Sequence, residues 1–187
     1  MAQSTRSKQT KQTENIVLNH LQPQALELEE AVLGALMIEQ DAYIEVSDIL
    51  KAESFYDHRH RVIYSAVTSL YISQRPIDIL TVTEQLKSTG QLEEAGGAVY
   101  IAMLAGKVTS SAHIEYHAQI IAQKAIAREI ISYSGELQTK AFDSTTDVSE
   151  LLQEAEGQLF QITHRNVKKD FSSIDTVLAD AMTRIKT

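Results

Sequence analysis

The stretch IEYHAQIIAQKAIAREIISYSGELQTKAF, residues 114–142, decides the fold class of this chain. It runs for nearly thirty residues without a proline, and Gly135 is its single glycine. A helix of this length exceeds those usual in globular domains. We therefore expect one continuous helix that projects from a compact body.

A second periodic segment follows the first after a short polar turn. The residues DSTTD, 143–147, have the composition of a turn with a helix-capping residue. Apolar side chains then recur at helical intervals, at Val148, Leu151, Leu152, Ala155, Leu159 and Ile162. Two long helices joined by a short turn pack side by side, so we expect an antiparallel helical hairpin.

The residues before this hairpin also have helical spacing, and no stretch alternates with period two for long. A first amphipathic helix is predicted from about Leu26 to Glu39, and Asp41 can cap a second. The positions predicted to face inward after it are Ile44, Val46, Ile49 and Leu50. A third, strongly periodic helix is marked by Val62, Ile63, Ala66, Val67, Leu70 and Tyr71. Pro76 ends the next connection, and Gly90 lies where a C-cap glycine belongs. The predicted fold class is all-α.

Composition restricts the classes of function. The 187 residues include 43% hydrophobic side chains and no cysteine, which excludes disulfides and thiolate metal sites. No run of eighteen apolar residues and no signal peptide is present, so we expect a soluble, cytoplasmic protein without a membrane partner. The net charge is −8, of which −7 falls on residues 21–109. This acidic body argues against extensive contact with nucleic-acid phosphates.

The two ends of the chain differ from the body. The polar, mildly basic start predicts a disordered tail over residues 1–22. We expect a helical head over 23–110, the hairpin over 111–165, and a linker with a last helix over 166–187. That helix has a narrow apolar stripe, which either folds back on its own body or, as we favour, docks on another chain.

The segment GGAVYIAMLAGKV, residues 96–108, raises the question of a phosphate site. A P-loop anchored on Gly106-Lys107 requires glycine at position 101 and a hydroxyl at 108, but Ile101 and Val108 stand there. The glycine pair at 96 and 97 could alternatively form an anion-binding turn. We favour a tight start to a helix of small residues.

Metal and catalytic motifs are weak. His113 and His117 have the i, i+4 spacing of metal ligands, yet no third ligand follows and Glu115 is misplaced for a zinc-protease base. We interpret them as two partly exposed polar positions, and we expect His60 to hydrogen-bond within the fold. The acidic pairs Glu29-Glu30 and Glu93-Glu94 are interpreted as solvated faces, and the basic residues Arg165, Lys168 and Lys169 as a solvated linker. No cofactor and no intrinsic catalysis are expected.

Residues 23–165 resemble the N-terminal region of bacterial replicative DNA helicases of the DnaB type. The landmarks are Ala31-Val32-Leu33-Gly34, Phe55-Tyr56, His60-Arg61, Pro76-Ile77-Asp78, Leu92-Glu93-Glu94 and Gly96-Gly97. The segment 171–186 is similar to the linker helix of that family. His113 and His117 depart from it, since an asparagine and an aromatic residue are common there.

The resemblance implies a compact multi-helix head, a long antiparallel hairpin and a C-terminal amphipathic linker helix. It also implies heads that pair, a ring of six subunits, and primase docking on the collar within the primosome, with a helicase loader as a further candidate partner. In that family ATP, Mg²⁺ and single-stranded DNA bind a RecA-like motor domain after the linker helix. The chain is therefore expected to be a non-catalytic fragment of an ATP-dependent 5′–3′ helicase.

Two sets of residues follow from the resemblance. The assembly interface of the hairpin is expected to use Ile126, Ile130, Tyr133, Leu137, Leu151, Leu152 and Leu159. The docking face of the linker helix is expected to use Ile174, Val177, Leu178, Ala181, Met182 and Ile185. Two alternatives stay open, namely a primase-type helicase-interaction domain of related helical architecture and a metal-dependent enzyme built on His113 and His117.

Overall fold

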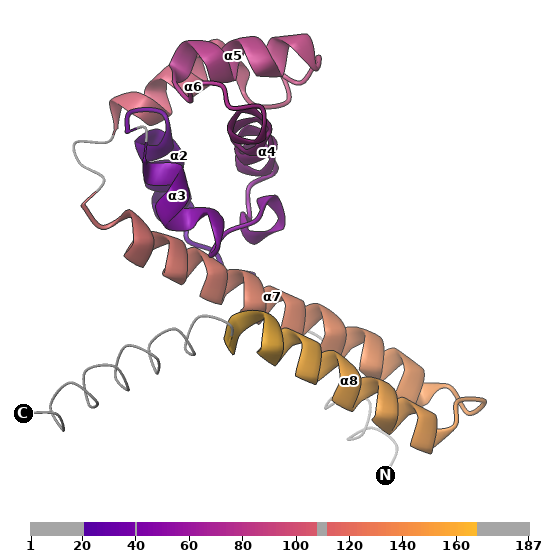
Figure 1. The fold of residues 1–187 in the computed structure, drawn as a ribbon. Coiled ribbons are helices and arrows are strands. Elements are labelled where there is room, and N and C mark those ends of the chain that lie inside the picture. Colours follow the sequence, from indigo (N-terminus) through magenta and orange to yellow (C-terminus); the bar gives the residue numbers. More distant parts are fainter. Residues whose placement is uncertain (1–20, 40, 108–111, 168–187) are drawn as a thin grey trace, which may run out of the picture. The chain divides into compact units, whose positions relative to one another are not determined.

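The computed structural model describes residues 21–39, 41–107 and 112–167, and Figure 1 shows their arrangement. The helices are α2 (Leu26–Leu36), α3 (Ala42–Ser47), the 3₁₀ helix η1 (Ala52–Ser54), α4 (His58–Ile72), α5 (Ile79–Ser88), α6 (Gly97–Gly106), α7 (Ile114–Phe142) and α8 (Val148–Val167). No strand occurs in the described ranges, which confirms the all-α prediction. The chain divides into two compact units, one ending at Glu129 and the other beginning at Ile130.

The core of the first unit is built around α4. This helix packs against α2, α5 and η1, while α6 packs on α2 and α5. Side chains from all four longer helices are fully buried in one cluster, among them Leu33, Ile63, Leu86 and Leu104. Burying each such side chain contributes about 1.5–3 kcal/mol, so this cluster is the main source of stability of the unit.

Local signals define the ends of α5. The side chain of Asp78 accepts hydrogen bonds from the backbone N–H groups of Leu80 and Thr81, both at 2.8 Å. The hydroxyl of Thr81 accepts from the N–H of Asp78 at 2.9 Å, which completes a reciprocal cap. At the other end Gly90 has φ +72°, a left-handed conformation that glycine adopts without strain. The predicted C-cap glycine is confirmed.

Two details of the predicted helices are wrong. The first helix ends at Leu36 and not at Glu39, because the N–H groups of Met37 and Ile38 bond to carbonyls three residues back and tighten the last turn. Ile44 was predicted to face inward but is exposed, since the short α3 turns Tyr43 and Val46 toward the core. Tyr71 lies on α4, as predicted, and is substantially exposed near the end of that helix.

The second unit contains α8 and the part of α7 that begins at Ile130. These helices run antiparallel, as predicted, on either side of the turn at residues 143–147 (Figure 1). Asp147 begins α8 by accepting from the N–H groups of Ser149 at 2.7 Å and Glu150 at 3.2 Å. An ion pair between Lys140 and Glu154 joins the two helices. None of the helices in the described ranges combines the length and apolar character needed to cross a membrane.

Candidate protein-interaction surfaces

A buried polar cluster links three helices of the first unit. Glu29 on α2 and His60 on α4 are each 1% exposed, so the prediction that Glu29 lies on a solvated face is wrong. Glu29 stands three and four residues before the buried Val32 and Leu33 and therefore shares their face of α2. That spacing is the sequence signal that could have identified it.

The Glu29 carboxylate accepts three hydrogen bonds from α4 and the connection before it. One oxygen accepts from the N–H of Tyr56 at 2.7 Å, and the other from the N–H of Asp57 at 3.3 Å and from Nδ1 of His60 at 2.7 Å. A buried carboxylate costs several kcal/mol to desolvate, which these three donors offset. Glu29 therefore fixes the start of α4 against α2.

His60 extends the cluster to α6. Its Nε2 lies 2.7 Å from the hydroxyl of Tyr100. When the neutral ring donates its Nδ1 proton to Glu29, Nε2 accepts a hydrogen bond from Tyr100. The two rings are also stacked, with centroids 6.1 Å apart. The prediction that His60 hydrogen-bonds within the fold is confirmed.

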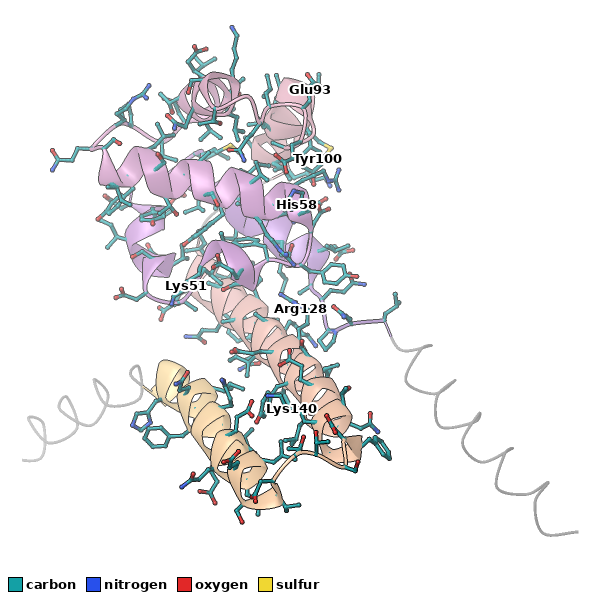
Figure 2. The ribbon with its side chains drawn as sticks, turned by 90° about the vertical axis from the view of Figure 1, so that its right-hand side faces the viewer. Lys51, His58, Glu93, Tyr100, Arg128 and Lys140 are labelled. Atoms are coloured by element: carbon teal, nitrogen blue, oxygen red, sulfur yellow. The ribbon has the colours of Figure 1, made fainter. Side chains whose placement is uncertain are left out.

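Charged side chains on the rim of this cluster are paired with one another. Arg59 forms an ion pair with Asp57 at 2.6 Å and lies 4.4 Å above the centre of the Tyr100 ring. The hydrogen bond from Arg59 lowers the pKa of Asp57, and burial raises the pKa of Tyr100. His58 bonds to Glu94, and Figure 2 shows the side of the head on which His58 and Tyr100 lie. These contacts hold the charged side chains against the rim of the cluster.

Arg128, on the part of α7 that belongs to the first unit, holds two distant segments together. Its guanidinium donates to the carbonyl oxygens of Pro23 and Ser54, both at 2.7 Å. Figure 2 shows where Arg128 lies on α7. Burial lowers the pKa of Arg128. The chain before α2 and the end of η1 are thereby attached to α7.

The glycine pair begins α6, as the sequence predicts, and its donors are already used. Gly96 and Gly97 have φ +93° and +78°, and their N–H groups donate to the carbonyls of Glu93 and Leu92 at 3.0 and 2.9 Å. A Cβ at Gly96 would come within 3.0 Å of the Tyr100 ring. The pair therefore serves the turn that brings Tyr100 to His60. Lys107 forms an ion pair with Glu30 at 2.6 Å.

The structure adds no support to the metal hypothesis. His113 is exposed and His117 is half-buried, and the backbone N–H of His117 donates to the carbonyl of His113 at 3.0 Å. Within residues 21–39, 41–107 and 112–167, no three side chains of His, Asp or Glu are grouped to hold a metal ion. The pair lacks the further ligands that a protein metal site uses.

The predicted hairpin interface divides into half-buried and exposed positions. Tyr133, Leu137 and Leu151 are half-buried, whereas Ile130, Leu152 and Leu159 are exposed, and Ile126 is half-buried in the first unit. Among the described residues, the Tyr133 hydroxyl is buried without a hydrogen-bond partner. Four more apolar side chains of this unit are exposed and were not among the residues predicted for the interface, namely Ile131, Phe142, Val148 and Phe160. The six residues predicted for the linker-helix face lie outside the described residues.

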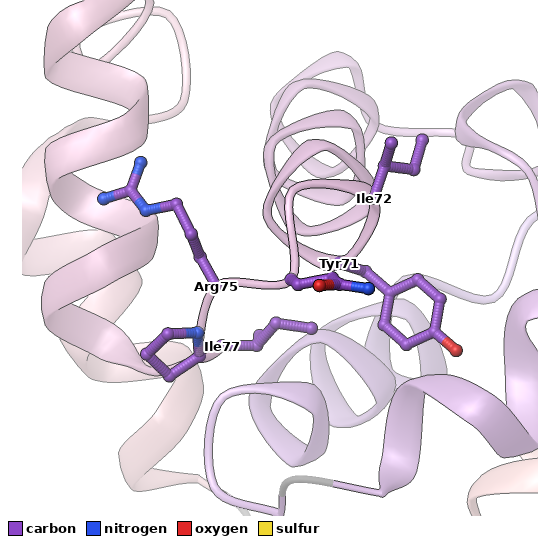
Figure 3. Close-up of a pocket in the computed structure, with 6 residues that line it drawn as sticks. Tyr71, Ile72, Arg75 and Ile77 are labelled. Atoms are coloured by element: carbon purple, nitrogen blue, oxygen red, sulfur yellow. The ribbon is translucent and has the colours of Figure 1, made fainter.

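A shallow pocket of about 540 Å³ lies at the connection between α4 and α5 (Figure 3). Its lining residues are Tyr71, Ile72, Gln74, Arg75, Pro76 and Ile77. Sequence analysis assigned Pro76 to the end of a connection and to a family landmark with Ile77 and Asp78, but not to a pocket. The spacing gave no signal of a pocket, because the cavity depends on how the end of α4 and the start of α5 lie together.

The fold and these surfaces define an all-helical domain in which the buried polar side chains of the head are mutually paired and apolar side chains are exposed on α7 and α8. Residues 21–123 match the family described as "DnaB-like helicase N terminal domain", and the chain belongs to that family. This finding confirms the resemblance inferred from the sequence landmarks.

The curated relatives are replicative helicases. The chain is 42% identical over 164 residues to a replicative DNA helicase DnaB of Rhodothermus marinus, covering 88% of this chain and 17% of the relative. It is 33% identical over 172 residues to the replicative DNA helicase DnaC of Bacillus subtilis (strain 168), covering 92% of this chain and 38% of the relative. The chain thus spans well under half the length of these relatives.

Two solved structures share the fold. The N-terminal domain of DnaB helicase from Mycobacterium tuberculosis matches with a TM-score of 0.71 and 30% identity, covering 76% of this chain and 99% of that one. A DnaB-like replicative helicase, described with its interactions with primase, matches with a TM-score of 0.63, covering 75% of this chain and 31% of that one. At 23% identity this second likeness concerns the fold alone.

Proposed function

We propose that this chain is the non-catalytic N-terminal part of a replicative DNA helicase, serving ring assembly and primase docking. The observation that carries the proposal is the family match over residues 21–123, supported by a match to 99% of a solved DnaB N-terminal domain. ATP-driven unwinding, with its ATP, Mg²⁺ and single-stranded DNA, is assigned to the longer part of such helicases that this chain does not span. In this proposal the chain itself binds no cofactor.

Self-association is proposed to use the hairpin of the second unit. Leu152 and Leu159 lie seven residues apart on one face of α8 and are 61% and 49% exposed. Ile130 is also exposed, and the Tyr133 hydroxyl has no partner among the described residues. Two helices cannot cover all their apolar positions alone, and a second hairpin would remove these side chains from water.

Primase docking is proposed for the same chain by analogy with the helicase that was solved with its primase interactions. Isothermal titration of the chain with the primase of the same organism tests this part, and we expect saturable binding. If the chain bound primase but stayed monomeric, the docking part of the proposal would stand and the assembly part would be contradicted. Absence of both would contradict the whole proposal.

Catalysis is tested separately. The purified chain should release no phosphate from ATP above the buffer rate, with or without single-stranded DNA. ATP turnover that stays with the chain through successive purification steps would contradict a non-catalytic role.

A further inference from the structure

The pocket between α4 and α5 exposes apolar side chains that the core does not use. Ile72 is 74% exposed and Tyr71 is 45% exposed, and both stand on its wall (Figure 3). The Tyr71 ring is held in place against Tyr43, with ring centroids 4.4 Å apart. Ile77, which is buried, lines the pocket as well. A fixed apolar wall beside solvent is typical of a site that receives an apolar side chain.

Gln74 has a backbone conformation that favours glycine. Its φ is +54°, the single positive φ of a non-glycine residue in the described ranges. The N–H groups of Gln74 and Arg75 donate to the carbonyls of Tyr71 and Leu70, both at 2.9 Å, which closes the end of α4. Helix α5 ends with the same pattern of bonds, but there Gly90 takes the left-handed position. A glutamine at this place of α4 is strained, and its side chain lines the pocket.

Arg75 supplies a cation at the pocket. Its described hydrogen bond runs from Nη1 to the neutral amide oxygen of Gln85 at 3.3 Å. By contrast, Arg59 pairs with a carboxylate, and Arg61 and Arg128 donate to backbone carbonyls. Within the described ranges Arg75 forms no ion pair, and it stands on a body whose residues 21–109 carry a net charge of −7. The guanidinium is therefore suited to an external carboxylate.

We propose that this pocket docks a peptide segment of another protein, which inserts one bulky apolar side chain and presents a carboxylate to Arg75. The apolar side chain lies against Tyr71, Ile72 and Ile77, and Gln74 bounds the pocket beside it. One cation on an acidic body is too little positive charge for a nucleic acid. The proposal is independent of the helicase assignment, because it depends only on the contacts of residues 71–77.

Two matched small probes test the proposal on the full 187-residue chain. N-acetyl-phenylalanine carries the apolar ring and a carboxylate, whereas N-acetyl-phenylalaninamide carries the ring alone. Each is titrated into ¹⁵N-labelled protein, and the shifts of the backbone amides of residues 71–75 and 77 are followed. We expect millimolar binding of both, with the acid about threefold to fivefold tighter, as for an exposed ion pair.

Variants separate the two parts of the site. Arg75→Gln should abolish the preference for the acid and leave binding of the amide unchanged. Ile72→Asp should reduce the affinity for both probes at least several-fold. If circular dichroism shows that this variant is unfolded, Ile72→Gln is measured in its place. Lys87→Gln, which removes an exposed cation near the end of α5, is the control and should change neither affinity.

Gln74→Gly provides a second readout. This variant should raise the melting temperature of the protein, because glycine adopts this φ without strain. It should at the same time lower the affinity for both probes, because the side chain of residue 74 no longer lines the pocket. Chemical shift changes that occur elsewhere on the surface would overturn the location of the site. Equal affinity for the acid and the amide would overturn the role of Arg75, and unchanged probe affinity in Gln74→Gly would overturn the role of Gln74. A fall in the sedimentation mass of Ile72→Asp relative to the wild type would show that a second copy of this chain occupies the pocket, which would overturn docking of a foreign peptide.

Discussion

At the scale of single residues, the head depends on a buried carboxylate whose two oxygens both accept hydrogen bonds. Glu29 accepts three hydrogen bonds from α4 and the residues just before it, and His60 is in turn hydrogen-bonded to Tyr100 on α6. Breaking a buried pair by removing one partner costs more than the pair contributes net, since the remaining group stays unpaired in a medium of low polarity. Adjacent Glu30 differs, because it is partly exposed and bonds to Lys107 at the surface.

Glu29→Gln should therefore destabilise the chain strongly. We expect the free energy of unfolding to fall by about 3 kcal/mol, because His60 loses its charged acceptor inside the core. Urea unfolding followed by circular dichroism measures this loss. The matched control Glu30→Gln should cost less than about 1 kcal/mol, as expected for an exposed pair. Equal effects of the two variants would contradict the role given to Glu29.

Asp57 should make stability depend on pH below the usual carboxyl range. The Arg59 hydrogen bond lowers its folded-state pKa below the ordinary value of 3.8. The resulting stability is fully present above pH 3.8 and is lost as pH falls through the lower folded pKa. Asp57→Asn keeps a capping side chain but cannot ionise. The stability difference between wild type and this variant should thus shrink on acidification, and a difference that grows would contradict the sign.

At the scale of elements, the ends of α4 and α5 have the same backbone geometry but different residues. Helices α4 and α5 both end in a left-handed residue with the same backbone bonds, yet one has Gln74 and the other Gly90. The glycine is explained by the backbone alone. The glutamine requires another reason, and the pocket that it lines supplies one.

The reciprocal cap of α5 is expected to contribute measurably to stability. Asp78→Ala removes the acceptor for two backbone N–H groups and should lower the free energy of unfolding by about 1 kcal/mol. Asp78→Ser keeps an acceptor and should restore most of the loss. Thermal unfolding of the three proteins compares them, and identical losses in both variants would indicate that the side chain acts through something other than the cap.

At the scale of the whole molecule, the two compact units differ in how many of their apolar side chains are buried. The first has a continuous apolar core, whereas the described helices of the second expose Leu152, Leu159 and Phe160. Exposed apolar side chains on one helix face favour association, because burial removes them from water. Assembly is therefore expected to depend on the second unit.

Leu152→Asp should prevent self-association while leaving the fold intact. Sedimentation equilibrium at micromolar concentration should give a mass above the monomer for the wild type and the monomer mass for the variant, because a charge cannot be buried unpaired in an apolar contact. Gln153→Asp, exposed on the neighbouring position, is the control and should associate like the wild type. A wild-type chain that is strictly monomeric would contradict the proposed assembly.

Much of the element structure was predictable from the sequence. The bounds of α7, the turn at 143–147 with a capping residue, and the positions of Gly90 and Gly96 follow from spacing and turn chemistry. These features depend on residues close together in the chain, so a linear pattern contains what determines them. The landmarks identified the family for the same reason, since they are short local motifs.

Tertiary structure alone decided the features that join distant residues. Glu29 is hydrogen-bonded to Tyr56, 27 positions further along the chain, and Arg128 to Pro23, 105 positions before it. The adjacent residues Glu29 and Glu30 both look solvated in the sequence. In the fold Glu29 lies in the core and Glu30 at the surface. The pocket at Arg75 likewise exists only where the end of one helix meets the start of the next. Sequence determined which segments are helices, because helical hydrogen bonds are local. Only the packed fold decided which polar groups are buried, because desolvation depends on every element that surrounds a side chain.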